Sequence, residues 1–319
     1  MTTEMMTFPA EAYQAAHAAA VLTEHPGWGM LRLSGATRLE LINRMSTQAV
    51  LDLKSGEGAA TVLTTDIGRI IDRPIVYATR DDAYLLTGKG HNDALARYFM
   101  RNIFFNDDVQ VQDISAETVV FGIYGPQAGE MLAAAGFPDV DVPLHHWRQA
   151  DIDGATAYFH RTDPIAGDGY FITAEMSHQD TVWNALLAAG ALAVDEAAFE
   201  YLRIEAGQPR FGRELTLDYI PLEAGLWADV SFNKGCYTGQ EIIARMESRG
   251  KLAKRLLRLR SAAPLEPGAQ ITADGRVAGT ITSAADGPAG PLALGYVKTS
   301  ALADGARLAV GDVLLTLVD

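Results

Sequence analysis

A short segment of the chain places its only cysteine among glycines, a lysine and the start of a predicted helix. Cys236 comes just before that helix, which the pattern predicts over residues 239–248, and two residues after Lys234. The free N–H groups and positive partial charge of a helix N-terminus stabilise a thiolate over a thiol. The segment therefore predicts a reactive cysteine. The residues leave a second interpretation open, a capping box of Thr238 and Glu241 with the cysteine as a small buried side chain.

A second candidate is Glu205, near the end of a helix predicted over residues 195–206. It lies off the apolar stripe that contains Phe199 and Leu202, and the negative end of the helix dipole disfavours a carboxylate there. Such a carboxylate is explained either by a ligand donor or partner, or by solvation beside Arg203. The residues alone do not decide between these.

A third candidate is Asp72, which interrupts an apolar predicted strand just before Pro74. Its carboxylate could point into a cleft and act on a ligand. The equally simple alternative is an outward side chain paired with Arg73 or another neighbour.

Residues 245–260 hold seven basic side chains and one acidic side chain, Glu247, in a chain whose net charge is −14. This reversal could receive a polyanion, or it could be the solvated face of a helix and a strand. The histidine pair at 145 and 146 shows none of the spacings typical of a metal site, so no metal site is expected.

The composition describes the class of protein that must position these groups. The 319 residues, with 48% hydrophobic and 21% charged side chains, are typical of a globular chain with two or three domains. A net charge of −14 argues against direct binding to nucleic acid or to anionic membranes. A single cysteine fits a reducing compartment, no apolar run reaches the length of a membrane span, and residues 1–10 resemble no signal or transit peptide. We therefore expect a cytoplasmic protein without a membrane partner.

The order of the predicted elements indicates an α+β fold. A helix is expected over residues 1–24, then strands and helices linked by hairpin-length turns, which favours antiparallel sheets. Residues 208–237 are predicted to be mostly loop. From residue 254 onward, strands alternate with Gly and Pro turns, including a hairpin signal at Asp274 and Gly275, so we expect a small C-terminal β-barrel or sandwich.

The octapeptide at 234–241, Lys-Gly-Cys-Tyr-Thr-Gly-Gln-Glu, resembles the signature of the YgfZ family of folate-binding proteins. These are relatives of the glycine-cleavage T-protein, an aminomethyltransferase. Further matches follow in the family's order at residues 35–50, 68–77, 124–128, 203–207 and 221–226.

This resemblance implies a three-lobed T-protein-like ring with a central cavity. A first lobe would contain residues 1–49 and 113–253, and a ferredoxin-like middle lobe would contain residues 50–112. Residues 1–253 together would form the aminomethyltransferase-like folate-binding region, and residues 254–319 the C-terminal β-barrel.

The resemblance also implies a function. Tetrahydrofolate, or a derivative, would bind against Glu205 and near Asp72, with Arg203 and Tyr237 completing the binding site. Cys236 would be the reactive group, tuned by Lys234, in a protein that supports assembly or repair of iron–sulfur clusters in client enzymes, among them a tRNA methylthiolase.

Two alternatives accompany this reading. One is a tetrahydrofolate-dependent aminomethyltransferase or demethylase in which Asp72 orients the amine or N5 of the folate. The other is a non-catalytic adaptor that binds a partner through the basic segment 245–260. The chain departs from the T-protein pattern at Arg73, where a second Asp is usual, and at Pro164, where a stacking Tyr is usual. Both departures weaken the case for a working aminomethyltransferase.

Overall fold

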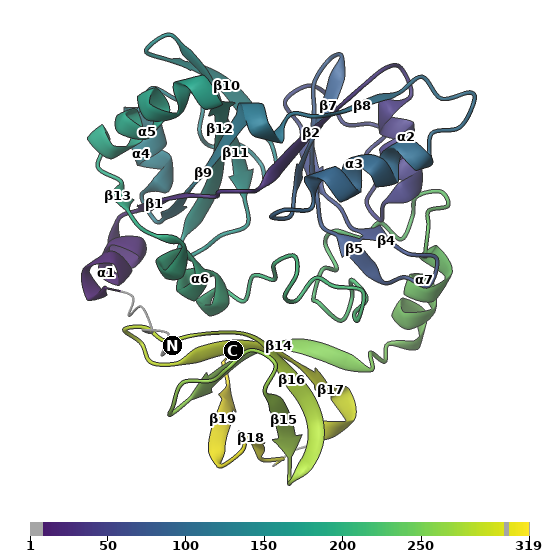
Figure 1. The fold of residues 1–319 in the computed structure, drawn as a ribbon, viewed down its shortest axis with the longest axis vertical. Coiled ribbons are helices and arrows are strands. Elements are labelled where there is room, and N and C mark those ends of the chain that lie inside the picture. The colour runs from purple at the N-terminus through teal and green to yellow at the C-terminus, as the bar shows by residue number, and fades with distance from the viewer. Residues whose placement is uncertain (1–8, 303–305, 319) are drawn as a thin grey trace.

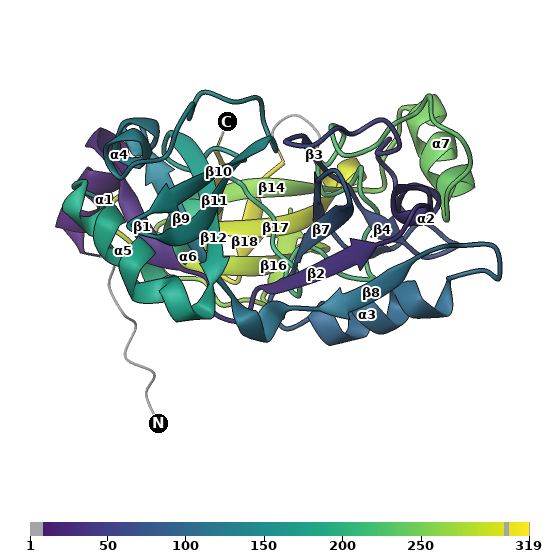
Figure 2. The same cartoon turned by 90° about the horizontal axis from the view of Figure 1, so that it is seen from above.

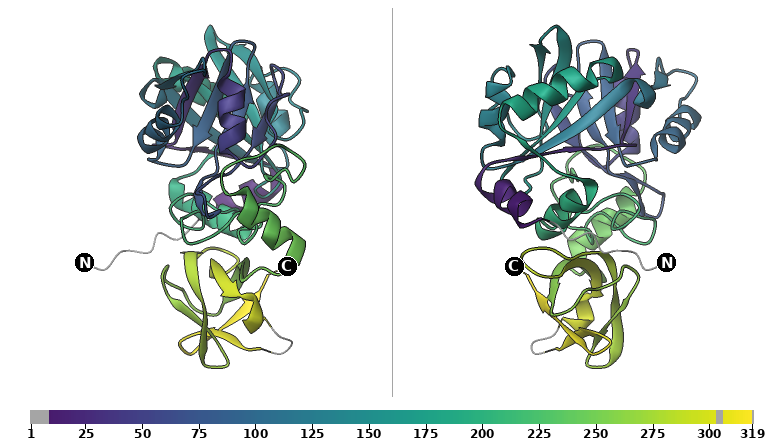
Figure 3. Two further views of the ribbon diagram at one scale, coloured as in Figure 1. Left: turned by 90° about the vertical axis from the view of Figure 1, so that its right-hand side faces the viewer. Right: turned by 60° about the vertical axis from the view of Figure 1, so that its left-hand side comes forward.

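The computed structural model shows two α/β lobes and a C-terminal barrel arranged as a ring (Figure 1). The structure describes residues 9–302 and 306–318, so part of the helix predicted over residues 1–24 lies outside it. The two α/β lobes lie side by side, as the view from above shows (Figure 2). The barrel lies beneath both of them (Figure 3). The sheets are antiparallel except for the pairing of β1 with β13, which agrees with the predicted α+β class with a C-terminal β-barrel.

The first lobe is built on a six-stranded sheet with the strand order β10-β11-β12-β9-β1-β13. Helices α4 and α5 pack on one face of this sheet, and α1 and α6 pack on the other. Because both faces are covered, every residue of β9 after Thr118 is buried. The elements are α1 (Ala10–Ala18), β1 (Val21–Glu24), β9 (Thr118–Gly125), α4 (Ala128–Ala134), β10 (Trp147–Ile152), β11 (Ala155–Thr162), β12 (Asp168–Glu175), α5 (Gln179–Ala188), β13 (Leu192–Ala193) and α6 (Glu196–Glu205).

The middle lobe contains a five-stranded antiparallel sheet with the order β3-β6-β7-β2-β8. Without β3, the chain order β2-α2-β6-β7-α3-β8 and the sheet order β8-β2-β7-β6 are those of a ferredoxin-like split βαβ unit. The elements are β2 (Gly29–Ser34), α2 (Arg38–Met45), β3 (Gly58–Ala60), β6 (Ile75–Ala78), β7 (Asp82–Thr87), α3 (Asn92–Arg101) and β8 (Gln110–Asp113). A two-stranded sheet of β4 (Leu63–Thr64) and β5 (Ile70–Asp72) extends from this lobe.

The C-terminal strands close into a barrel with the order β14-β17-β16-β15-β18-β19. The turn between β15 and β16 confirms the predicted hairpin, since Asp274 and Gly275 both have positive φ angles, 48° and 79°. The strands are β14 (Lys254–Ser261), β15 (Gln270–Ala273), β16 (Arg276–Ala285), β17 (Leu292–Lys298), β18 (Leu308–Val310) and β19 (Val313–Leu317). Short 3-10 helices lie at Ser115–Glu117, Met176–His178 and Thr299–Ala301.

One apolar cluster joins the three parts of the ring. It combines side chains of α6 and of β9 with Tyr77 and Leu86 of the middle lobe and Leu292 and Leu294 of the barrel. The lobes therefore share a core, and the space between them is fixed by packed side chains.

Several element boundaries differ from the sequence-based expectation. The helix expected over residues 1–24 ends at Ala18, and Val21–Glu24 is strand β1 because it pairs with β9 and β13 in the sheet. Strand β10 was not expected. Strand β2 lies in the middle-lobe sheet, outside the range 50–112 predicted for that lobe, and we propose residues 29–113 as its extent. In the described residues, no helix is both long and apolar enough to cross a membrane.

Candidate functional site

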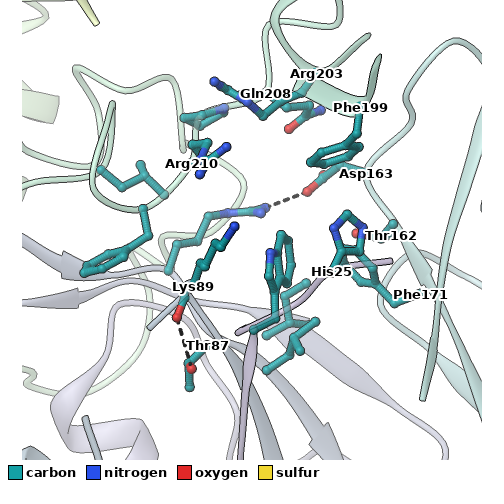
Figure 4. A pocket seen from close by; sticks show the side chains of 18 of the residues that line it. His25, Thr87, Lys89, Thr162, Asp163, Phe171, Phe199, Arg203, Gln208 and Arg210 are labelled. Carbon is teal, nitrogen blue, oxygen red and sulfur yellow. Dashed lines mark hydrogen bonds and ion pairs between the residues drawn. The ribbon is translucent and has the colours of Figure 1, made fainter. Parts of the chain in front are cut away.

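A cavity, called the main cavity below, lies where the first lobe, the middle lobe and the irregular segment after α6 meet (Figure 4). A second, more open cavity nearby is larger, with about 1150 Å³ of empty space. The main cavity holds about 940 Å³ of empty space, counted to its open mouth. The exposed surface of its wall is mostly apolar, as is usual for a small-molecule site, and eight of the 24 lining residues are charged.

Aromatic rings form one wall of this cavity. His25 and Trp28, from the turn between β1 and β2, lie with their ring centroids 4.5 Å apart. The ring of Phe199, on α6, contacts the His25 ring edge-on, with the two ring centroids 4.6 Å apart. The ring centroid of Phe171, on β12, lies 5.2 Å from that of Trp28. The rings come from β12 and α6 of the first lobe and from the connection that leads into the middle lobe, so segments far apart in the sequence have to come together before this wall exists.

His25 is the buried polar group of that wall. Its Nε2 lies 2.8 Å from the Tyr124 hydroxyl oxygen. Burial, with smaller contributions from Arg210 and Lys89, lowers the pKa of His25 to about 3. The imidazole is therefore neutral at pH 7, and it can donate or accept a hydrogen bond without bringing a charge into the cavity.

Asp72 lines the same cavity, at the end of β5, and is 1% exposed. Its Oδ1 accepts a hydrogen bond from the Arg73 backbone N–H at 2.7 Å. Its Oδ2 lies 3.2 Å from the Gly88 nitrogen and 3.1 Å from His91 Nδ1. These donors fix the direction of the carboxylate and leave part of its acceptor capacity for a ligand.

Four cations line the cavity, and the two more exposed ones are Lys89 and Arg210, both labelled in Figure 4. Lys89 Nζ lies 2.7 Å from a carboxylate oxygen of Glu196. Arg210 Nη1 lies 2.6 Å from Glu200 Oε2, and Arg210 Nη2 lies 3.7 Å from Glu196 Oε1. The part-exposed cations can exchange these partners for the carboxylates of a ligand, since surface ion pairs of this type contribute little net energy.

Arg73 lies between two carboxylates in the wall that separates the main cavity from a second, more polar one. Its Nε lies 2.5 Å from Asp229, and its Nη2 lies 2.9 Å from Asp163, which is the dashed contact at Asp163 in Figure 4. Burial alone would lower the pKa of Arg73, but the two carboxylates raise it above its ordinary value. The guanidinium is thus permanently charged and held from both sides.

Arg203 also lines the cavity, but its guanidinium serves the fold. It is 2% exposed and donates to Glu214 at 3.1 Å, to Ser283 Oγ at 2.8 Å and to the Gln208 carbonyl at 2.7 Å, besides its ion pair with Glu200. These contacts join α6 to the following segment and to the barrel. The predicted binding role of Arg203 is therefore replaced by a bracing role.

Glu205 does not line either cavity, contrary to the expectation that it would bind the cofactor. Its carboxylate accepts hydrogen bonds from the Tyr13 hydroxyl at 2.7 Å and from His17 Nε2 at 2.9 Å, both on α1. Burial and this contact raise the pKa of Tyr13 to about 12. The carboxylate off the apolar stripe thus has structural partners on α1, Tyr13 and His17, in place of the ligand or the arginine neighbour that the sequence suggested.

The ammonium of Lys234 lies against the end of α2. It is therefore not placed to tune the thiol of Cys236, contrary to the prediction from the sequence. Its Nζ donates to the backbone carbonyls of Asn43, Ser46 and Gln48 at 2.5, 2.8 and 2.9 Å. Burial lowers the pKa of Lys234 to about 8. The three acceptors use all three ammonium protons, so Lys234 acts as a clamp on the end of that helix.

Tyr237 is buried among Leu222, Val230 and Ile243, away from the cavities that it was predicted to line. The ammonium of Lys234 lies 5.2 Å from the centre of its ring. Tyr237 therefore anchors the segment and does not contact a ligand in the cavity.

Cys236 is exposed and forms no disulfide, so it is not the buried apolar side chain of the alternative reading. The predicted helix is α7 (Gln240–Arg249), and its N-cap is Gly239 without a side-chain cap. The capping box is therefore wrong, because Glu241 pairs with Arg245 instead. Neither cavity is lined by Cys236.

The basic segment is divided between α7 and β14. Arg245 pairs with Glu241 on the exposed face of α7, and Arg258 donates to the Glu205 carbonyl. Arg249, Lys251 and Arg255 are also exposed. Within the described residues, no group of three or more His, Cys, Asp or Glu side chains is arranged to hold a metal ion.

Sequence reasoning did not identify the aromatic wall, nor Lys89, Asp163, Arg210 and Asp229. The available signals were weak: His25 precedes Pro26 in a turn, and Asp163 precedes Pro164 in a loop. Neither pattern distinguishes a ligand-facing side chain from any other turn residue.

Comparisons with known proteins fit this architecture. The family described as GCVT N-terminal domain matches residues 2–234, and the CAF17 C-terminal beta-barrel domain matches residues 254–319. The chloroplastic protein At1g60990 of Arabidopsis thaliana, whose name describes a candidate transferase, is 32% identical over 97% of this chain and 72% of its own length. An aminomethyltransferase of Desulforamulus reducens is 28% identical over 90% of this chain and 80% of its own length.

A solved structure has the same fold. The glycine cleavage system aminomethyltransferase T of Bartonella henselae superposes with a TM-score of 0.84 at 22% identity, over 97% of this chain and 87% of that one. The extent of these matches along the sequence establishes membership, and the chain belongs to the family with a GCVT N-terminal domain, to which it adds a CAF17-type C-terminal β-barrel.

Proposed function

We propose that this protein binds a reduced folate in its main cavity and supports the assembly or repair of iron–sulfur clusters in client enzymes, as a protein of the YgfZ and CAF17 type. The observation that carries the folate part is the composition of the cavity wall: packed aromatic rings, the buried carboxylate of Asp72, and the part-exposed cations Lys89 and Arg210. The aminomethyltransferase relatives, whose reaction uses tetrahydrofolate, support the same choice of ligand.

The side chains present fit a folate, which has a flat pterin, an aryl linker and an acidic glutamate tail. The rings of Trp28 and Phe199 offer apolar surface to the flat parts. Asp72 is a fixed acceptor for pterin N–H groups, and neutral His25 can hydrogen-bond without a charge penalty. Lys89 and Arg210 would pair with the glutamate carboxylates. A bound reduced folate supplies nitrogen atoms that carry one-carbon units.

The second part of the proposal concerns Cys236. Its side chain is exposed on the surface, while Lys234, Tyr237 and Gly239 around it are engaged in holding the segment in place. An exposed thiol on a fixed segment suits contact with a partner protein or with a cluster as substrate. The free thiol and the single cysteine suit a reducing compartment such as the cytoplasm.

Calorimetric titration with tetrahydrofolate and with its 5-formyl form tests the folate part. We expect binding by the parent protein, and an affinity lower by about 10- to 100-fold in Asp72→Asn because a charged acceptor is lost. Phe199→Leu should also weaken binding, by removing ring contact. Glu205→Gln is the matched control and should bind like the parent, since its carboxylate faces α1. Absence of binding by the parent would reject the folate part.

Complementation tests the role of Cys236. In cells that lack the protein, Cys236→Ser should fold normally and fail to restore iron–sulfur enzyme activity. Ser248→Ala, at an exposed position of α7, is the control and should restore it. Full rescue by Cys236→Ser would remove the thiol from the function and favour the non-catalytic adaptor.

The transferase alternative is weakened by two observations. Arg73 stands as a bound cation beside Asp72, and Pro164 offers no ring to stack on a ligand. We expect no turnover of a lipoyl-bound aminomethyl group, measured as methylene-tetrahydrofolate formation. Robust formation of that product would establish the transferase function instead.

A further inference from the structure

We propose that Asp163 and Asp229 form a binding site for an organic cation, and that the chain fills this site with its own Arg73 side chain. The proposal concerns the far wall of the cavity in which we propose that folate binds. It identifies Arg73 as the residue that keeps a cationic ligand out of that cavity.

The geometry is that of a ligand clamp. The guanidinium is shared between two carboxylates, with Nε 2.5 Å from Asp229 Oδ2, Nη2 3.4 Å from Asp229 Oδ1, and Nη2 2.9 Å from Asp163 Oδ2. Two carboxylates that converge on one planar cation are the usual complement to guanidinium or ammonium ligands. Without the arginine, this pair would present two negative charges to the same space.

The backbone that carries the two carboxylates is held by contacts other than those with Arg73. Asp229 belongs to the segment before α7, and its backbone carbonyl accepts a hydrogen bond from Thr47 Oγ1 at 2.6 Å. Asp163 follows β11 of the first lobe. Arg73 reaches both of them from the link between β5 and β6 in the middle lobe. Removal of its side chain therefore leaves Asp229 on a hydrogen-bonded segment and Asp163 directly after Thr162, which pairs with Gly169 of β12.

The position of Arg73 between the two cavities determines which ligands the main cavity can take. Arg73, Asp163, Gln208 and Pro209 line both the main cavity and the second cavity, so they form the partition between the two. The Arg73 side chain is 14% exposed, which leaves little of it open to exchange. The ion-paired arginine closes the partition and occupies its acidic groups, so the main cavity takes its ligand without a cationic second ligand beside it.

Chemical rescue tests the site without any folate, so its outcome is separate from that of the folate titration. Arg73→Ala should be destabilised relative to the parent. Guanidinium or methylguanidinium at millimolar concentration should raise its Tm, by roughly 2 °C at ten times the dissociation constant, whereas NaCl at equal ionic strength should not. The parent protein should show no such rise, because its site is full.

Two controls make the result specific. Arg32→Ala removes a guanidinium from the part-exposed ion pair with Asp82 and should show no rescue. The double variant Arg73→Ala with Asp229→Asn should lose the rescue seen in Arg73→Ala. Where Arg73→Ala does not fold, Arg73→Gln takes its place in the same measurements. A variant without guanidinium-specific stabilisation, or a parent stabilised equally, would overturn the proposal.

Discussion

The ammonium of Lys234 donates hydrogen bonds to backbone carbonyls at the end of helix α2. The last carbonyls of a helix carry negative partial charge and have no partner within the helix. The ammonium of Lys234 satisfies this need at the end of α2 and holds its own segment to the middle lobe through the same contacts. At this scale, the segment around Cys236 is an anchored loop that leaves the thiol exposed.

The clamp should be visible in stability. Lys234→Met keeps the length and apolar contact of the side chain but leaves three carbonyls without their donor. We expect the free energy of unfolding to fall by about 1.5–3 kcal/mol in urea denaturation. Lys251→Met, at an exposed position, should change it by less than about 0.5 kcal/mol. Equal effects of the two substitutions would show that the clamp adds no stability.

The residues of the site show what a sequence can and cannot reveal. The pattern predicted the helix that carries both Phe199 and Glu205, and it correctly separated the apolar stripe from the carboxylate. It could not reveal that α1 covers the Glu205 side of this helix, because the two contacts join residues 192 and 188 positions apart. Asp72 was identified because a carboxylate in an apolar strand is unusual wherever the strand lies.

At the scale of elements, α7 and the β4–β5 hairpin hold the cysteine segment between them. Gly239, at the start of α7, has a φ of 84°, and a Cβ on it would lie 2.5 Å from the Thr65 carbonyl oxygen. Thr64 Oγ1 donates to the Thr238 carbonyl at 2.6 Å on the same contact. The glycine is therefore required for both its conformation and its close approach.

A pair of glycines at the two ends of α7 separates these two requirements. Gly239→Ala should lower the free energy of unfolding by about 2–4 kcal/mol, because it adds both a left-handed conformation and a steric overlap. Gly250→Ala, whose φ is 59° and whose Cβ would meet nothing within 4 Å, should cost only about 1 kcal/mol. Denaturant titration measures both, and similar costs would show that the packing against the hairpin is unimportant.

Element boundaries illustrate the same limit as the site. Local patterns predicted helix α7 and a β-rich C-terminal region, because the signals for helix ends and for turns lie within a few residues of sequence. They missed β1, because four residues gain a strand conformation from their partners in β9 and β13 and not from their own alternation. The range 50–112, which the resemblance implied for the middle lobe, leaves out β2. The place of β2 in the sheet is decided by its pairing with β7 and β8.

At the scale of the whole molecule, buried histidines lie where the first lobe meets the middle lobe. His160 packs on Tyr77 with ring centroids 4.0 Å apart, and the His145 carbonyl approaches Gly58. Burial lowers the pKa of His160 to about 3 and of His145 to about 4. With His25, these groups stay neutral in the folded protein at pH values where they are protonated in the unfolded chain.

The sign of the pH effect follows from these values. Between pH 6.5 and 4 the unfolded chain binds more protons than the folded one, so the free energy of unfolding falls as the pH is lowered. From pH 7.5 to 5 we expect a loss of about 1–2 kcal/mol for each of the three histidines, measured by urea denaturation at both values. His160→Gln should lose correspondingly less over the same interval, and an unchanged pH dependence in that variant would contradict this explanation.

The place of β2 in the middle lobe has a consequence for synthesis on the ribosome. All strands of the middle-lobe sheet lie between Gly29 and Asp113, so this lobe can complete its sheet early. Strand β1 emerges before it but gains its first sheet partner only with β9, about 100 residues later, or roughly 5–20 s at ordinary translation rates. The amino-terminal strand of the nascent chain must therefore wait, unpaired, while the lobe that follows it folds.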